Sequence, residues 1–388
     1  MTLITTTNSL SELCNKLKES EYVTVDTEFI REKTYWPDLC LIQIADNKNA
    51  AVVDVLSPNI NIEPLLNIMH DPKILKVFHA ARQDLEIFFK LTNRLPQPLF
   101  DTQIAAMVCG FGDSVGYDTL VNKITGKIID KSSRFTDWSL RPLTQKQIDY
   151  ALGDVTHLRL VYENLNQHLL EGERSEWLRE EVEKLNDTSI YQTSPPDAWK
   201  RIKSRNTNPR FLGVLKELAS WREKEAQKKN IPRNHVIKDE ALVEIAHSTP
   251  KSLKNLTRIR GLGQRTAEGY VGQSLLKAVE VGENIPSNQC PQVPRRPSIP
   301  KNIGPITDYL KVLLKMKCDE HGIAQKLIAN SADIEKLAAF GSKAGVAAIS
   351  GWRKNLFGED AINLIEGRST IIIEEQKLRL ATYRQKTD

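Results

Sequence analysis

Three short segments rich in β-forming residues lie close together near the start of the chain, and they constrain the fold most. Residues 22–29 (YVTVDTEF) alternate between apolar and polar positions, while residues 39–45 (LCLIQIA) and 50–55 (AAVVDV) are nearly continuous apolar runs. Connections this short leave no room for the crossover helix that parallel neighbours need. The sequence therefore predicts three consecutive antiparallel strands.

Beyond residue 55 the pattern alternates between strand and helix. Residues 74–78 predict a strand that leads into a helix over 81–90, and residues 100–107 predict another strand-to-helix passage. Residues 145–172 keep apolar side chains at helical spacing. Strands followed by alternating β and α elements indicate an α/β domain with a mixed sheet, which we place at residues 1–190.

The rest of the chain predicts only helices, with two breaks. Thr, Ser and paired prolines over 189–196 indicate a domain boundary, and four prolines within 289–300 indicate a linker, which we place at 286–302. We therefore expect all-α domains at 197–285 and 303–375, and a polar tail at 376–388. Both helical segments begin with a long amphipathic helix followed by shorter ones, which is consistent with a diverged internal repeat.

Charge is spread unevenly along the chain. The net charge is +5, but residues 1–190 carry −8, residues 191–300 carry +10 and residues 301–388 carry +3. An acidic front joined to a basic middle favours a polyanion that is held by the basic part while chemistry occurs in the acidic part. Chance variation between domains is the alternative.

Several classes of protein are disfavoured by composition. A hydrophobic content of 40% excludes a wholly disordered chain. No apolar run approaches the ~18 residues of a membrane helix, and the first residues lack the basic-then-apolar pattern of a secretory signal. Five widely spaced cysteines without a CxxC pair argue against a disulfide framework or a zinc site. We expect a protein of the reducing cytoplasm that does not act at a membrane.

Carboxylates from three predicted elements form the candidate catalytic group. Asp26 and Glu28 are two apart on a strand and share a face, and Tyr150 and Asp154 are four apart on a helix and share another. Asp84 follows the strand at 74–78. Each is ordinary alone, but together the four acids could surround two divalent cations, with the tyrosine placed to position a water.

These positions resemble a known family. Three segments match the motifs of the DEDD superfamily of 3′-to-5′ exonucleases, and Tyr150 marks the tyrosine subgroup: residues 25–29 (VDTEF), 78–85 (FHAARQDL) and 150–155 (YALGDV). Residues 32–44 and 100–105 are most similar to bacterial ribonuclease D. Residues within 209–262 resemble the HRDC module, named for helicases and ribonuclease D. The resemblance covers residues 1–285 strongly; a second HRDC-like unit at 303–375 is inferred from length and helical pattern.

The resemblance implies a role for each residue. Asp26 would bridge two ions (Mg²⁺ or Mn²⁺), Glu28 and Asp154 would complete the first metal site, Asp84 would support the second, and Tyr150 would orient the attacking water. Thr27, Phe29 and His79 would hold the 3′ end of the substrate; packing in the core is the alternative for Phe29, and a structural hydrogen bond is the alternative for His79. It further implies a monomeric ribonuclease H-like exoribonuclease that trims transfer RNA precursors and releases mononucleotides.

Basic side chains of the middle segment are candidates for phosphate contacts. They lie in two groups: Lys200, Arg201, Lys203, Arg205 and Arg210, and then Arg258, Arg260 and Arg265 around two loop glycines. Solvated helix faces are the alternative for all of them. Three other functions stay open: the same chemistry on DNA, a nucleic-acid adaptor without catalysis, and a protein-binding module. Gln43 is a weaker substrate-contact candidate, and Asp101 is expected to cap a helix.

Overall fold

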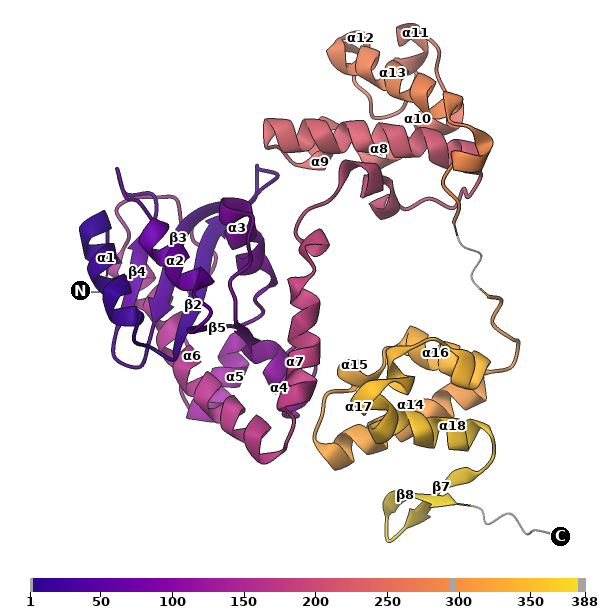
Figure 1. Cartoon of the computed structure of the whole chain (residues 1–388). Helices are drawn as coiled ribbons and strands as arrows, with labels where there is room; N and C mark the ends of the chain where they lie inside the picture. Colours follow the sequence, from indigo (N-terminus) through magenta and orange to yellow (C-terminus); the bar gives the residue numbers. More distant parts are fainter. Residues whose placement is uncertain (1–2, 294–296, 383–388) are drawn as a thin grey trace, which may run out of the picture.

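A computed structural model describes residues 3–293 and 297–382 (Figure 1). Parts of the predicted linker and tail, residues 294–296 and 383–388, lie outside the described residues. The chain forms three units, which we call the sheet domain (residues 1–190), the first helical unit (197–285) and the second helical unit (303–382). Among the described residues, none of the helices has both the length and the apolar character required to cross a membrane.

The sheet domain contains a mixed sheet of six strands. The strand order is β1-β4-β3-β2-β5-β6, with β2 antiparallel to β3 and β3 antiparallel to β4, whereas β2–β5, β5–β6 and β1–β4 are parallel. This confirms the predicted antiparallel strands and mixed sheet. The strands are β1 (Leu3–Ile4), β2 (Tyr22–Ile30), β3 (Asp38–Ala45), β4 (Ala50–Asp54), β5 (Leu75–Phe78) and β6 (Leu99–Asp101).

Helices cover both faces of this sheet. Apolar residues of α1, α2 and α3 pack with Val23 and Val25 of β2 on one face. On the other face lies α6, whose Val155 carbonyl accepts a hydrogen bond from the Thr24 hydroxyl of β2 at 2.9 Å. The helices of this domain are α1 (Thr7–Leu17), α2 (Glu63–His70), α3 (Arg82–Thr92), α4 (Thr102–Val108), α5 (Tyr117–Thr125), α6 (Gln145–Glu171) and α7 (Ser175–Glu183).

The two helical units begin alike. Each starts with a long helix, then a helix of four residues and one of ten, an order that supports the predicted repeat. The first unit contains α8 (Pro209–Lys229), α9 (Arg233–Val236), α10 (Asp239–Ser248), α11 (Leu253–Leu256), α12 (Gln264–Glu268) and α13 (Tyr270–Asn284). The second contains α14 (Gly304–His321), α15 (Gln325–Ile328), α16 (Ser331–Phe340), α17 (Gly351–Arg353), the π-helix η7 (Lys354–Gly358) and α18 (Glu359–Ile365).

The expected polar tail begins instead with a strand. Residues Lys377–Thr382 form β8, which pairs antiparallel with β7 (Ser369–Glu374). The two residues between the strands, Glu375 and Gln376, both have positive φ, at 49° and 60°. Positive φ at both positions is typical of the tight hairpin turn that Asn-Gly normally supplies, so the sequence lacks the usual hairpin signal.

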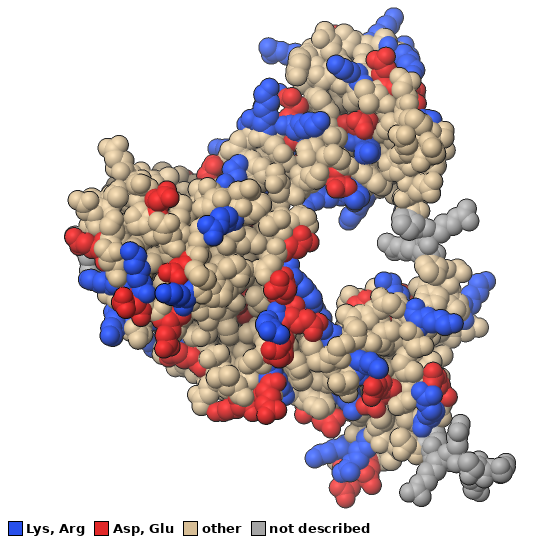
Figure 2. Space-filling model, viewed as in Figure 1, with Lys and Arg blue, Asp and Glu red and all other residues tan. Residues whose placement is uncertain are grey.

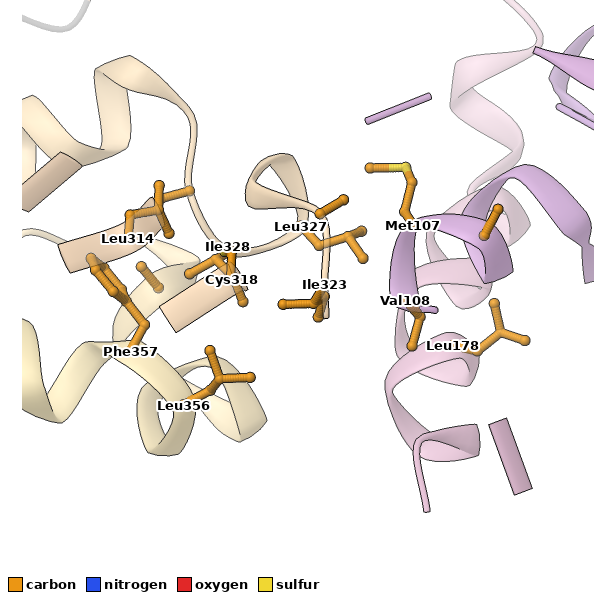
Figure 3. Close-up of a cluster of buried hydrophobic side chains, with 14 of the residues drawn as sticks. Met107, Val108, Leu178, Leu314, Cys318, Ile323, Leu327, Ile328, Leu356 and Phe357 are labelled. Atoms are coloured by element: carbon orange, nitrogen blue, oxygen red, sulfur yellow. The ribbon is translucent and has the colours of Figure 1, made fainter. Parts of the chain in front are cut away.

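The second helical unit packs directly on the sheet domain. One buried apolar cluster contains Met107, Val108 and Leu178 of the sheet domain together with Ile323, Leu327 and other residues of the second unit (Figure 3). Polar contacts frame this cluster. The Ala324 amide donates to the Met107 carbonyl at 2.9 Å, and the buried Arg353 guanidinium donates to Glu180 at 2.6 Å. The rings of Trp177 and Trp352 stack with centroids 4.5 Å apart.

A smaller polar contact joins the first helical unit to the β2–β3 connection. The Tyr35 hydroxyl donates to Glu223, a fully buried residue of α8, and accepts from Arg233 at 2.7 Å. The Trp36 amide donates to the Asn230 side chain at 3.0 Å. Because this connection directly follows β2, the first helical unit is tied to the end of one central strand.

Gly110→Ala is expected to loosen the second unit from the sheet domain. Gly110 has φ +79°, and a Cβ there would lie 2.5 Å from the Gly322 carbonyl oxygen of the second unit. Gly126 has a similar φ of +71° with nothing within 4 Å, so Gly126→Ala carries only the backbone cost of about 1–2 kcal/mol. Small-angle X-ray scattering should show a larger radius of gyration for Gly110→Ala alone. Equal radii for the two variants would contradict the tight contact.

Candidate active site

The predicted acidic residues converge on one cavity of about 800 Å³. Asp26 and Glu28 come from β2 and Asp154 from α6, and each offers an oxygen such that the three atoms lie within 4.8 Å of one another. Alternation along β2 turns Asp26 and Glu28 toward α6, where Asp154 projects from the turn after Tyr150. The period-two and i,i+4 spacings therefore placed these residues together correctly.

Asp84 reaches the same cavity from the other face of the sheet. It lies in the first turn of α3 and is buried, and it accepts a hydrogen bond from the Thr27 hydroxyl, which projects from β2 on the α3 side. Asp84 also lines the cavity, and the charge of Asp26 contributes, after burial, to raising its pKa. The Thr27 side chain thus holds a catalytic candidate from the neighbouring helix α3.

The carboxylates disfavour one another's ionisation. Burial, and then the charges of Asp26, Asp154 and Asp84, raise the pKa of Glu28 to about 10. Burial also raises the pKa of Asp154, to about 7, while the Tyr150 hydroxyl and the Arg134 guanidinium act in the opposite direction. The pKa values of Asp26 and Asp84 are raised as well, first by burial and then by a neighbouring carboxylate. Such a cluster is electrostatically unfavourable unless protons or cations neutralise it.

The site fits hard divalent cations. Carboxylate oxygens are the ligands that Mg²⁺ and related ions prefer, and here three of them can approach a single point. The repulsion that raises their pKa values is what a cation would relieve. Among the residues that the structure describes, the group that could hold an ion consists of carboxylates alone.

Tyr150 and Trp138 also line the cavity. The Tyr150 ring lies 6.0 Å from the ring of Trp138, which is buried. Burial, and then the charge of Asp154, raise the pKa of the Tyr150 hydroxyl, so the group stays protonated and can donate or accept a hydrogen bond. It is therefore suited to orienting a water without ionising.

Two supporting residues were not singled out by the sequence. Tyr117 of α5 donates its hydroxyl to the backbone carbonyls of Gly153 and Asp154, at 3.2 and 2.5 Å, and so anchors the turn of α6 that carries Asp154. Trp138 backs Tyr150. No spacing rule connects either residue to the acidic motifs, because both contacts depend on how the α5–α6 connection folds.

The other predicted substrate contacts are placed as follows. Phe29 and His79 both line the cavity, and the His79 Nδ1 lies 3.0 Å from the Thr102 hydroxyl. Asp101 caps α4 as predicted, accepting from the amides of Gln103 and Ile104. Gln43 lies opposite Asp26 in the strand register but is fully buried and is not part of the cavity lining.

The predicted phosphate contacts lie away from this cavity, in the first helical unit and the segment that enters it. Most of them are exposed, but two are engaged within the protein. Lys200 pairs with Asp197 at 2.6 Å. Arg210 donates to the Glu283 and Ile285 carbonyls and so holds the end of α13. Figure 2 shows Lys and Arg on several sides of this unit rather than in one stripe. The exposed residues are Lys200, Arg201, Lys203, Arg205, Arg258, Arg260 and Arg265.

Comparison with known proteins places the chain in a family. A model of the 3′-5′ exonuclease family matches residues 1–170, and a model of the HRDC domain matches residues 211–279. A ribonuclease D from Granulibacter bethesdensis is 46% identical over 382 residues, which is 98% of this chain and 96% of that protein. The chain belongs to the ribonuclease D family. The second helical unit lies outside the HRDC match, so its HRDC-like identity stays a prediction.

Further ribonuclease D proteins agree with this assignment. One from Bartonella henselae is 44% identical over 378 residues, covering 97% of this chain and 93% of that protein. The crystal structure of Escherichia coli RNase D, described as an exoribonuclease involved in structured RNA processing, aligns with a TM-score of 0.80 at 32% identity. That alignment covers 94% of this chain and 98% of the Escherichia coli chain. The chain thus belongs to a family of 3′-to-5′ exoribonucleases, as the motifs predicted.

Proposed function

We propose that this ribonuclease D removes nucleotides one at a time from the 3′ ends of transfer RNA precursors and other structured RNAs. The observation that carries the proposal is the convergence of Asp26, Glu28 and Asp154 within 4.8 Å, with Asp84 and Tyr150 lining the same cavity. All five positions come from one chain, which supports a monomer as the active form. Five free cysteines, four of them buried, support work in the reducing cytoplasm.

The carboxylates would hold two divalent cations, Mg²⁺ or Mn²⁺. Asp26, whose neighbours include the other acids, would contact both ions. Glu28 and Asp154 would complete one site, and Asp84 the other. Cations held there would neutralise the carboxylates, make a bound water more acidic and stabilise charge on the phosphate and on the leaving 3′ oxygen.

The protein groups then account for the direction of attack. Tyr150, one helical turn from Asp154, would orient the water toward the phosphorus of the last phosphodiester bond. The bond from phosphorus to the 3′ oxygen breaks, and a nucleoside 5′-monophosphate leaves while the shortened RNA keeps a 3′ hydroxyl. Phe29, His79 and the backbone at Thr27 would hold the terminal nucleotide, because they line the cavity beside the acids.

The first helical unit would bind the body of the RNA through its exposed basic side chains. Phosphate contacts release counterions, so binding should weaken steeply with salt. The three exposed arginines near α11 and α12 and those near residues 201–205 are the candidates. Arg210 and Lys200 are weaker candidates because each already has partners in the protein.

A nuclease assay tests the proposed function. A transfer RNA with a 3′ extension and a 5′ label is incubated with the full-length protein, with Mg²⁺ or Mn²⁺ and in parallel with chelator, beside a DNA strand of the same sequence. We expect a ladder that shortens by single nucleotides, only with metal and faster on RNA. Tight binding without shortening would favour the non-catalytic adaptor, and faster loss of DNA would reassign the substrate.

A further inference from the structure

The connection between α5 and α6 forms a wall of the catalytic cavity. Residues 126–144 run from the end of α5 to the start of α6, and Arg134, Phe135 and Trp138 among them line the cavity together with the acidic residues. Trp138 faces inward and is buried, whereas Phe135 is 90% exposed. Phe135 therefore presents an aromatic ring to solvent beside the acidic residues, where the 3′ end of an incoming RNA can reach it.

Arg134 lies over one face of the Phe135 ring, and because Phe135 is 90% exposed the other face is open to a ligand. The Arg134 guanidinium carbon lies 5.2 Å from the centroid of its ring. Bases of single-stranded nucleic acid stack on aromatic side chains with little dependence on sequence, which suits an enzyme that removes every nucleotide in turn. The cavity of about 800 Å³ is of a size that can hold one or two nucleotides.

Arg134 is a cation without an acidic partner among the described residues that line the cavity. The other two cationic residues of the lining are engaged: Arg31 pairs with Glu86 at 2.8 Å and Lys131 pairs with Asp118 at 2.7 Å. Arg134 lies close enough to the acids for its charge to lower the pKa values of Glu28 and Asp154. A free guanidinium beside a phosphodiester site is suited to hold a phosphate oxygen.

We propose that Arg134 and Phe135 form a clamp for the RNA 3′ end, in which Phe135 stacks on one of the last two bases and Arg134 contacts an adjacent phosphate. The clamp rests on the proposed exonuclease function and adds its substrate-positioning residues. It explains why the mouth of the cavity presents an aromatic ring and an arginine next to each other in the chain. It also predicts that both residues contribute to the binding of short unstructured RNA. Contacts with the helical units are not needed for such a substrate.

Kinetics on a short single-stranded RNA test the stacking. Loss of one base–aromatic stack corresponds to a change of roughly five-fold or more in affinity. We therefore expect Phe135→Ala to raise KM by about that factor with a smaller change in kcat, and Phe135→Trp to keep the wild-type KM. Ile128→Ala is the matched control, because Ile128 lies in the same connection and is 89% exposed but does not line the cavity. A KM for Phe135→Ala equal to that of Ile128→Ala would overturn the stack.

Changing the substrate separates stacking from a structural role. Two RNAs are compared, one without the base of the last nucleotide and one without the base of the penultimate nucleotide. The RNA that lacks the base that stacks on Phe135 should bind wild type and Phe135→Ala with equal affinity. If Phe135→Ala weakens both abasic RNAs as much as intact RNA, the residue acts on protein structure and not on a base. In chelator, 2-aminopurine at the stacked position should lose fluorescence on binding wild type and keep it with Phe135→Ala.

Salt dependence tests Arg134. Removing one phosphate contact to single-stranded RNA should make the negative slope of log affinity against log salt concentration less steep by about 0.7. We expect this change for Arg134→Gln, a smaller one for Arg134→Lys, and none for Lys127→Gln, which removes an exposed charge from the same connection outside the cavity lining. An unchanged slope for Arg134→Gln would refute the phosphate contact. Wild-type protein that shortens no RNA would instead refute the proposed function.

Discussion

The Asp26→Asn protein is expected to lose at least about 10³-fold in exonuclease rate and yet to unfold at a higher temperature than wild type in chelator. Transition-state charge stabilisation by a bound metal amounts to several kcal/mol, and each 1.36 kcal/mol is tenfold in rate. Stability should rise because Asn keeps the shape of the side chain but removes a buried carboxyl group that, without metal, must either ionise beside the other acids or retain a proton. We expect a gain of about 1 kcal/mol, which corresponds to the relief of about one pKa unit.

Asp149→Asn is the matched control for this variant. Asp149 lies on α6 next to Tyr150, is exposed, and accepts from the Gln145 side chain at 2.8 Å. It is not among the residues that line the cavity, so we expect both the rate and the unfolding temperature to stay at wild-type values. RNA binding in chelator should be kept by both variants. An Asp26→Asn protein that is less stable than wild type would show that Asp26 serves the fold rather than the reaction.

The spacing of the acidic residues and Tyr150 explains why the candidate site could be predicted from the sequence. Asp26 and Glu28 occupy the polar positions of an alternating strand whose Val23 and Val25 are fully buried on the opposite face. Tyr150 and Asp154 lie on a helix whose period is clear, and α6 spans Gln145–Glu171, close to the predicted 145–172. Where carboxylates fit the period of a clear strand or helix, the spacing alone determines which face they share.

Contacts between distant segments could not be predicted in this way. The Thr27–Asp84 hydrogen bond crosses from β2 to α3, and the Tyr35–Glu223 contact joins residues 188 positions apart. Arg353 belongs to an ordinary polar segment of sequence, yet its side chain is buried against Glu180 and the Leu327 carbonyl. Propensity and periodicity describe one helix or strand at a time, whereas these contacts depend on how the folded elements pack against one another.

The charge of the first helical unit shows the limit of composition. Its excess of basic residues suggested a polyanion, and the family acts on RNA, but binding of RNA by this unit stays a prediction. The individual residues were harder to choose, since Arg210 donates to two backbone carbonyls and Lys200 has an acidic partner. By contrast, Arg134 and Phe135 belong to residues 1–190, whose net charge is negative and therefore did not indicate a phosphate contact there. A net charge describes a whole domain, and a site depends on which side chains remain unpaired.

Metal binding is expected to stabilise the protein, and to do so more strongly at pH 8 than at pH 6. Without metal, the pKa of Glu28 is raised to about 10 and that of Asp154 to about 7, so the folded state holds protons that the unfolded chain has released. The stability of the metal-free protein should therefore fall as the pH rises from about 5 through 8. Metal ligands must be deprotonated, so a bound cation keeps the carboxylates ionised and removes this loss.

Thermal unfolding at the two pH values measures this linkage. A metal present at about 100 times its dissociation constant stabilises by about 2.7 kcal/mol, which for a domain of this size corresponds to roughly 5–10 °C in Tm. Calorimetric titrations at pH 7 in two buffers with different ionisation enthalpies should show protons released as the metal binds. Asp149→Asn should behave as wild type, whereas Asp154→Asn should lose most of the gain in Tm. A larger gain at pH 6, or no proton release, would mean that these carboxylates are already ionised without metal and that their mutual repulsion is balanced by other groups.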